Sequence, residues 1–437
     1  MPSLPRKGFA IRKLVAFVFL LGTFAALLAG CGGSGVPPSA REFNRIAAGW
    51  RHTVALKSDG TVWAWGGNFY GQLGDNTTTD RTTPVQVVGP GSTGYLTGVA
   101  SVAASYLHTV ALKSDGTVRA WGYNRNGELG DNTTTDRSTP VQVVGPGGTG
   151  YLTGIVAIAA GDLHTVALKS DGTVWTWGGN SIGQLGDNTT TDRSTPVQVV
   201  DPGGTGYLTG IVAVAAGAYH TVALKWDGTV WGWGGNFNGQ LGDNTFVSPR
   251  STPAQIVGPG GTGYLTGIAS VAAGGNHSVA LKSDGTLRAW GWNFYGELGD
   301  NTTTDRSTPV QVVAPGGTGY LLGVTSVSAC YFHTVALKSD GTVWTWGYNS
   351  HGQLGDNTTT NRSTPGQVVG PGGTGYLTGF ASVAGGVYHT VALKSDGTFW
   401  TWGWNGNGEL GDNTTTNRST PVQVVGPGGT GYLLETN

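Results

Sequence analysis

The sequence predicts an all-β fold assembled from seven copies of one unit, and three observations lead to that prediction. The phrase H-T-V-A-L-K-S-D-G-T, or a near copy, begins at seven histidines spaced 56 or 57 residues apart. Each copy holds four short segments with the apolar patterns of strands, separated by turn sequences. Residues 43–435 contain seven whole units with nothing left over. We therefore expect a seven-bladed β-propeller of four-stranded antiparallel blades over residues 43–437.

The third copy illustrates the four strands expected in each blade. Residues 155–160 are an apolar run bounded by glycines, which is typical of a buried inner strand. Residues 164–169 alternate as a second strand, and a Ser-Asp-Gly-Thr turn leads to a third strand at 174–177. After a long loop, a fourth strand is expected at 196–200, beginning with proline, which is tolerated at the first position of a strand.

Tryptophan on the third strand is expected to fill the space between blades. The side chains are large enough to dominate a core, and we expect each to pack on the small Ala, Thr and Gly face of the next blade. The tryptophans concerned are Trp65, Trp121, Trp177, Trp233, Trp290, Trp346 and Trp402. At the seam, residues 45–50 are expected to pair beside the last repeat and clasp the ring, with flush closure within the first blade as the alternative. A parallel β-helix is the alternative fold, disfavoured because its coils are usually shorter and lack such a hairpin.

The first thirty residues read as a lipoprotein signal peptide that is cleaved from the mature protein. Basic residues precede an apolar run of 16 residues, which is short for a membrane span. The run ends in Leu-Ala-Gly-Cys31, which resembles the lipobox of bacterial lipoproteins and implies acylation of Cys31, with residues 31–42 as a flexible tether. Residue 32 is not aspartate, so the resemblance implies the outer membrane of a bacterial cell envelope, on its periplasmic or surface side. An ordinary signal peptide with an incidental cysteine is the alternative.

Charge and composition exclude several functions. Without residues 1–30 the chain keeps 20 Lys and Arg against 25 Asp and Glu, a net charge of −5, and no basic tract. We therefore expect no nucleic-acid partner. We also expect the protein to be a monomer that contacts the membrane through its lipid anchor alone.

Cofactor, metal and catalytic motifs are weak in this sequence. The Gly-Pro-Gly-Gly-Thr-Gly loops lack the lysine of a phosphate-binding loop, so no cofactor is expected. The repeated histidines have no cysteine or acidic partners at metal-ligand spacing and are expected to be structural. For the Asp-Asn-Thr-Thr-Thr-Asp loops, a turn supported by an Arg–Asp pair is favoured over calcium. No Ser/His/Asp arrangement stands out, so a binding protein is favoured over a hydrolase or lyase.

Two pairs of residues vary from copy to copy within the otherwise constant repeat. One pair precedes each repeated histidine, between the first and second strands, and the other follows each W-G-x-N motif, between the third and fourth strands. In an antiparallel blade both loops lie at the same end, and aromatic residues are frequent there, as at interface anchors. The candidate partner-binding residues are Trp50, Arg51, Phe69, Tyr70, Tyr106, Leu107, Arg125, Leu163, Ile182, Tyr219, Phe237, Phe294, Tyr295, Tyr331, Phe332, His351 and Tyr388. Drift at tolerant loop tips is the alternative explanation.

The repeat also resembles a known family. The pattern W-G-x-N-x-x-G-Q/E-L-G, as in residues 177–186, followed by A-A-G-x-x-H-T-V-A-L, is similar to the repeat of the regulator of chromosome condensation family, across all seven copies. The resemblance implies a propeller and a role in protein–protein interaction. Its founding activity, guanine-nucleotide exchange, is a weaker expectation because no inserted wedge segment is visible. The partner is an unknown protein, with envelope glycan binding or a purely structural surface role as alternatives.

Overall fold

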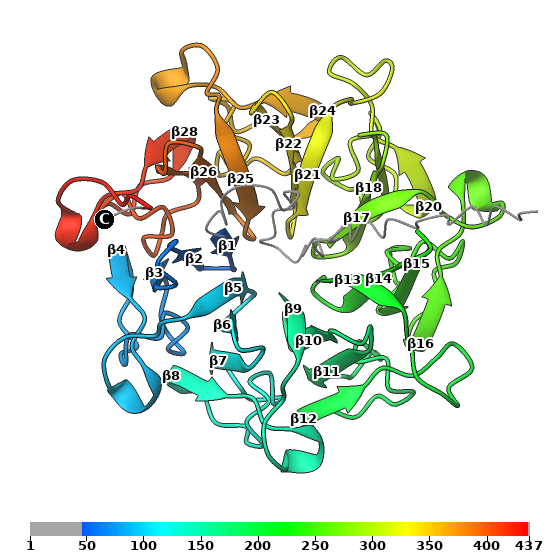
Figure 1. Cartoon of the computed structure of the whole chain (residues 1–437). Helices are drawn as coiled ribbons and strands as arrows, with labels where there is room; N and C mark the ends of the chain where they lie inside the picture. Colours follow the sequence, from blue (N-terminus) through cyan, green and yellow to red (C-terminus); the bar gives the residue numbers. More distant parts are fainter. Residues whose placement is uncertain (1–45, 436–437) are drawn as a thin grey trace, which may run out of the picture.

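The computed structural model describes residues 46–435, which form seven four-stranded antiparallel sheets around a central axis (Figure 1). The sheets are numbered as blades one to seven in chain order, and the strands of each blade run from the axis outward. The seven-bladed β-propeller predicted from the repeat period is therefore confirmed. Within the described residues the helices are five single-turn 3-10 segments, and none is long and apolar enough to cross a membrane.

The innermost strands are β1 (Ile46–Ala48), β5 (Val99–Ala104), β9 (Ile155–Ala160), β13 (Ile211–Ala216), β17 (Ile268–Ala273), β21 (Val324–Ala329) and β25 (Phe380–Gly385). The second strands are β2 (His52–Leu56), β6 (His108–Lys113), β10 (His164–Lys169), β14 (His220–Lys225), β18 (His277–Lys282), β22 (His333–Lys338) and β26 (His389–Lys394). The third strands are β3 (Val62–Gly66), β7 (Val118–Gly122), β11 (Val174–Gly178), β15 (Val230–Gly234), β19 (Leu287–Gly291), β23 (Val343–Gly347) and β27 (Phe399–Gly403).

The outer strands are β4 (Arg81–Gln86), β8 (Arg137–Gln142), β12 (Arg193–Gln198), β16 (Arg250–Gln255), β20 (Arg306–Gln311), β24 (Arg362–Gln367) and β28 (Arg418–Gln423). The 3-10 segments are η1 (Pro90–Ser92), η2 (Pro146–Gly148), η3 (Pro259–Gly261), η4 (Pro371–Gly373) and η5 (Pro427–Gly429).

The outer strand of each blade begins earlier than the sequence predicts. In blade three it starts at Arg193, so Pro196 lies inside the strand and not at its first position. The ladder to β11 shifts register around this proline, pairing Val197 with Thr176 and Arg193 with Gly178. Proline is accepted there because this is an edge strand with a local bulge, where a missing N–H leaves no ladder partner unpaired.

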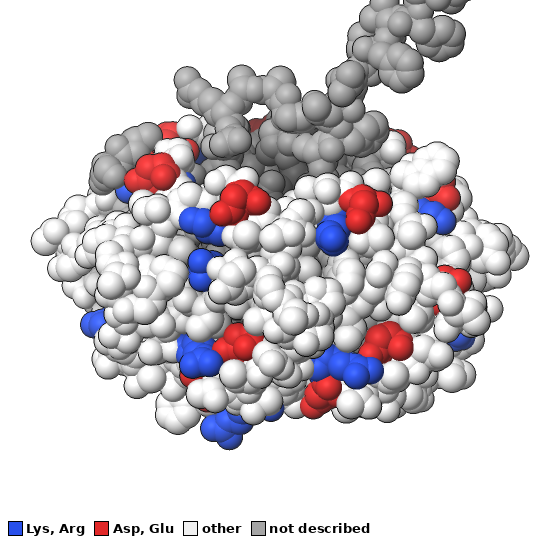
Figure 2. All heavy atoms as spheres, turned by 60° about the horizontal axis from the view of Figure 1, so that its bottom comes forward, with Lys and Arg blue, Asp and Glu red and all other residues white. Residues whose placement is uncertain are grey.

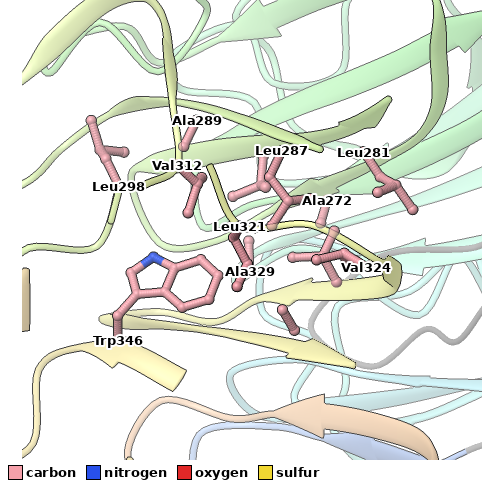
Figure 3. Packing of buried hydrophobic residues seen from close by; sticks show 13 residues of the cluster. Ala272, Leu281, Leu287, Ala289, Leu298, Val312, Leu321, Val324, Ala329 and Trp346 are labelled. Carbon is pink, nitrogen blue, oxygen red and sulfur yellow. The ribbon is translucent and has the colours of Figure 1, made fainter. Parts of the chain in front are cut away.

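The conserved tryptophans are fully buried, but they pack in the opposite direction from the one expected. Trp346 of blade six lies against Ala289, Leu298 and Val312 of blade five, the preceding blade (Figure 3). Its indole N–H donates to the carbonyl oxygen of Glu297, also in blade five, at 2.8 Å. The prediction of packing on the next blade is wrong because the acceptor for the indole and the apolar surface both belong to the preceding blade.

The repeated histidines form hydrogen bonds between each blade and the next, which confirms their predicted structural role. His164 Nε2 lies 2.9 Å from the hydroxyl of Thr221 in blade four, and that hydroxyl donates to the carbonyl of Gln184 at 3.0 Å. Because the hydroxyl has one proton and gives it to the carbonyl, His164 must donate through Nε2. Burial lowers the pKa of this imidazole to about 3, so the ring stays neutral.

The ring closes flush, without a clasp. Strand β1 pairs with β2 of its own blade, with Ile46 opposite Ala55, so the predicted pairing of residues 45–50 beside the last repeat is wrong and the alternative is correct. Blade one already has its inner strand, and the seam between blades one and seven (Figure 1) is held by the same contacts as every other. Trp65 donates to the carbonyl of Glu409 at 2.9 Å, and His389 lies 2.8 Å from the Thr53 hydroxyl.

Arg–Asp pairs support the long loop before each outer strand, as predicted. In blade two, Asp131 Oδ2 accepts from Arg137 at 2.8 Å, while Oδ1 accepts from Asn124 at 3.1 Å and from the Thr133 hydroxyl at 2.6 Å. Both carboxylate oxygens of Asp131 therefore hold the loop in place. Figure 2 shows acidic and basic side chains lying beside one another on a surface that is otherwise uncharged.

Candidate functional site: the variable face

The two variable sets of loops lie side by side at one end of the ring. We call this end the variable face; it consists of the inner loops before each second strand and the outer loops before each fourth strand. Phe332, in an inner loop of blade six, lies with its ring 6.0 Å from that of Tyr295, in the outer loop of blade five. His351 of blade six lies 5.2 Å from Tyr388 of blade seven. The prediction that both sets share one face is confirmed.

Exposure separates the predicted residues into those at the surface and those beneath it. Phe69, Phe237 and Phe294 project from outer loops with 75%, 65% and 64% of their surface exposed. Arg51 and Arg125 are also exposed. Half-buried positions are Trp50, Tyr70, Tyr106, Leu163, Ile182, Tyr219, Tyr295, Tyr331, Phe332, His351 and Tyr388. Leu107 is buried, so it supports the loop from below and is not available for contact.

Blades five to seven carry a continuous aromatic cluster. Phe294 packs edge-on against Tyr295 at 4.9 Å, and Phe332 stacks on Tyr388 at 5.6 Å. We call this group the aromatic cluster; its members are Trp292, Phe294, Tyr295, Tyr331, Phe332, Tyr348, His351, Tyr388 and Trp404. Offset and edge-to-face contacts of this kind fix the rings in place before any ligand arrives.

Sequence reasoning missed one position of this face. The x residue of W-G-x-N is aromatic in four blades, as Tyr123, Trp292, Tyr348 and Trp404, and glycine in the other three. Within the aromatic cluster, the rings of Trp292 and Tyr348 each contact both Tyr295 and Phe332. The signal was present, because this position changes between glycine, tyrosine and tryptophan from copy to copy.

Blades one and two carry a smaller group in which cations lie over aromatic rings. Trp50 stacks on Tyr106 with ring centroids 4.2 Å apart, and the Arg51 guanidinium lies 4.1 Å from the Trp50 ring. Arg125 lies 5.9 Å from the ring of Tyr70 in the neighbouring outer loop. Such cation–π contacts favour a fixed arrangement of the arginines.

Blades three and four make the variable face asymmetric. Both have glycine at the x position, and a Cβ at Gly235 would lie 3.0 Å from Ile182 and 3.4 Å from the Tyr219 Cβ. Leu163 is 3.1 Å from the corresponding point at Gly179. The small residues thus let Ile182 and Leu163 settle into the surface, where blades five to seven have stacked rings.

Three buried glutamates lie beneath the face. Glu128, Glu297 and Glu409 occupy a position that is glutamine in the other four blades, and each uses Oε2 to accept a backbone N–H of its own loop at 2.8–2.9 Å. Their Oε1 atoms have no hydrogen-bond partner among residues 46–435. Burial raises the pKa of Glu128 and Glu297 to about 8 and that of Glu409 to about 7.

Family models built on RCC1 repeats match this sequence over most of its length. The family model described as the RCC1-like domain matches residues 148–433, and models of the regulator of chromosome condensation (RCC1) repeat match segments within residues 43–168. The ultraviolet-B receptor UVR8 of Arabidopsis thaliana is 34% identical over 390 residues, covering 88% of this chain and 82% of the receptor. The human E3 ubiquitin-protein ligase HERC2 is 29% identical over 397 residues, covering 85% of this chain but 7% of that protein.

Solved structures agree on the fold. Human WBSCR16 superposes with a TM-score of 0.69 at 23% identity, covering 84% of this chain and 95% of that chain. Yeast RCC1 (Prp20), in its structure with Kap60, gives 0.66 at 23% identity, covering 84% of each chain. Since a family model matches well over half of the sequence, and a relative is 34% identical across most of both chains, this chain belongs to the family of RCC1-like repeat propellers.

Proposed function

We propose that this protein is an exported, lipid-anchored binding module that captures a protein partner on its variable face. The observation that carries the proposal is the aromatic cluster of blades five to seven, with Phe294 exposed above rings that are already packed. Aromatic anchors dominate the energetics of protein interfaces. Rings held by their neighbours lose little further freedom when a partner docks, so more of the contact energy is kept as affinity.

Features of the relatives support an interaction role. Yeast RCC1 was solved bound to a second protein, Kap60, and UVR8 is named as a receptor. HERC2 is named as a ligase, but this chain matches only a small part of that protein, so its activity does not transfer. On these grounds we favour binding over catalysis. Nucleotide exchange remains the weaker alternative.

The proposed anchor rests on the sequence alone. Cys31 and the tether of residues 31–42 lie outside the described residues, and the lipobox-like Leu-Ala-Gly-Cys is the support for acylation there. Acyl chains on Cys31 would hold the propeller at the outer membrane and confine its search for a partner to the cell envelope.

A pull-down from cell-envelope extract tests the interaction. The test variant combines Phe69→Ser, Phe237→Ser and Phe294→Ser, which remove exposed rings without opening the core. The matched control combines Tyr95→Ser, Tyr151→Ser and Tyr207→Ser, which lie in the loops between blades at the opposite end and are about equally exposed. We expect the test variant to lose the captured protein and the control to keep it; equal capture by both contradicts the proposal.

A second candidate function rests on that opposite end. One exposed tyrosine recurs per blade and forms a backbone bridge with the second residue after each outer strand. The exposed fractions are similar, between 54% and 63%, for Tyr95, Tyr151, Tyr207, Tyr264, Tyr320, Tyr376 and Tyr432. Seven equivalent rings suit a repeating ligand such as an envelope glycan, because weak sites then act together. Binding of a glycan array that is lost in the tyrosine variant, and kept in the phenylalanine variant, would favour this function.

A further inference from the structure

A small hollow of about 20 Å³ opens on the axis of the ring at the variable face. Its wall includes the first variable residue of every inner loop, so all seven blades contribute one position. The wall is aromatic at Trp50, Tyr106 and Tyr331, and small at Ala218 and Gly275. Sequence comparison identified these positions as variable, but only the closed ring brings them to one point.

Asp162 is the one charged side chain among the residues that line the hollow. Its backbone N–H donates to the Ala218 carbonyl at 3.3 Å, which fixes the loop. The structure describes no hydrogen bond or ion pair for its carboxylate within residues 46–435, whereas the loop aspartates such as Asp131 use both oxygens. Burial raises the pKa of Asp162 to about 7, and no cation offsets this effect.

The groups that face Asp162 carry no positive charge. They are Tyr106, Tyr219 and Tyr331, whose rings interact electrostatically with its carboxylate. Burial raises the pKa of all three hydroxyls, so they stay neutral around neutral pH. Arg51, the charged residue of the adjoining loop, lies over the Trp50 ring at 4.1 Å. Asp162 is half-buried, and a carboxylate in such surroundings without a counter-ion is unfavourable, so an incoming cation on its accessible side would stabilise it.

The shape of the hollow selects among cations. Tyr106 is fixed by stacking on Trp50, and Tyr331 leans over Gly275, where a Cβ would lie 2.7 Å from its ring. Aromatic walls suit an unbranched aliphatic stem that ends in a charge. A guanidinium has five donors spread over a plane, and the wall offers it one carboxylate. A primary ammonium has three donors on a compact point charge, so it matches a single carboxylate better.

We propose that the axial hollow receives the ammonium group of a lysine side chain of the partner protein, with the ammonium on Asp162 and the stem outside the hollow, against Tyr106 and Tyr331 at its rim. This deepens the proposed function, on which it rests, by naming the chemistry that the partner presents. The arrangement places one charged contact at the centre of the face and the aromatic cluster to one side of it.

Calorimetry with small probes tests the inference without the partner. Nα-acetyl-lysine amide is compared with Nα-acetyl-norleucine amide, which has a similar stem and no charge. We expect only the lysine probe to bind, and Asp162→Asn to weaken it at least tenfold. Asp201→Asn, at a half-buried aspartate in the loop between blades three and four, is the matched control and should change nothing. Equal binding of the two probes, or no effect of Asp162→Asn, overturns the proposal.

The pH profile and two further probes sharpen the result. Because Asp162 must ionise, lysine binding should strengthen by about tenfold between pH 6 and pH 8, and Asp162→Asn should abolish this dependence. Nα-acetyl-arginine amide binding as tightly as lysine, or n-butylammonium binding more tightly, would reassign the hollow to arginine or to free amines and contradict the proposal. If lysine binds yet the phenylalanine variant still captures the partner, the proposed function fails instead.

Discussion

Replacing Glu128 by glutamine should stabilise the propeller at neutral pH and leave it nearly unchanged in acid. Burial raises the pKa of Glu128 from its ordinary value of 4.5 to about 8, and its Oε1 has no partner among residues 46–435. Below pH 4.5 the carboxyl is protonated in both folded and unfolded chains. As the pH rises from 4.5 towards 8, only the unfolded chain ionises, so folding stability falls.

The size of the effect follows from the pKa difference. Each pH unit in this window removes about 1.4 kcal/mol, which gives about 3 kcal/mol per glutamate between pH 4.5 and pH 7. Glutamine keeps the acceptor oxygen that the loop uses, as Gln184 does for Ile182 in blade three. For a folded body of this size, 3 kcal/mol corresponds to about 4 °C in Tm.

Thermal melts of the wild type and Glu128→Gln at pH 4.5 and pH 7 measure this difference. The variant should melt about 4 °C higher at pH 7 and at the same temperature at pH 4.5. The reverse change, Gln184→Glu, is the matched control and should make blade three newly sensitive to rising pH. Parallel pH profiles for the wild type and Glu128→Gln would refute the reasoning.

Three further outcomes follow from the contacts between blades and from the proposed anchor. Trp346→Ala should lower the free energy of unfolding by about 3–5 kcal/mol in a urea titration, because it leaves a cavity between blades five and six; a loss below about 1 kcal/mol contradicts this packing. Thr53→Val should lower the free energy of unfolding by about 1–3 kcal/mol in the same assay, because His389 loses its acceptor across the junction of blades one and seven. Thr109→Val, which removes the acceptor of His52 between blades one and two, should lower it by the same amount. Cys31→Ser should abolish metabolic labelling with an alkyne-bearing palmitate and release the protein from the membrane fraction; persistent labelling would exclude Cys31 as the acylated residue.

The repeat carries most of the fold. A constant phrase every 56 or 57 residues requires equivalent blades, and the antiparallel order of strands puts both variable loops at one end. The core position of tryptophans such as Trp346 follows from their size alone. These features depend on local pattern and topology, which the sequence of a single unit contains.

Other features depend on how one unit meets the next. The direction in which Trp346 packs is set by its acceptor at Glu297, a carbonyl that no side-chain pattern reveals. The flush seam depends on the pairing of β1 with β2, which the repeat register permits but does not require. Pro196 enters an outer strand because that strand is an edge with a bulge. The isolation of Asp162 emerges only when seven loops converge on the axis.

Site-specific photo-crosslinking tests the central claim, that one face of the ring is the recognition surface, most directly. A photoreactive phenylalanine analogue is placed at Phe294 on the variable face or at Tyr264 in the loop that joins blades four and five at the opposite end. The two side chains have similar exposure, 64% and 59%. On illumination in intact cells, we predict a discrete protein adduct from position 294 and none from position 264. An adduct from 264 alone, or the same adduct from both, would contradict the assignment of the variable face.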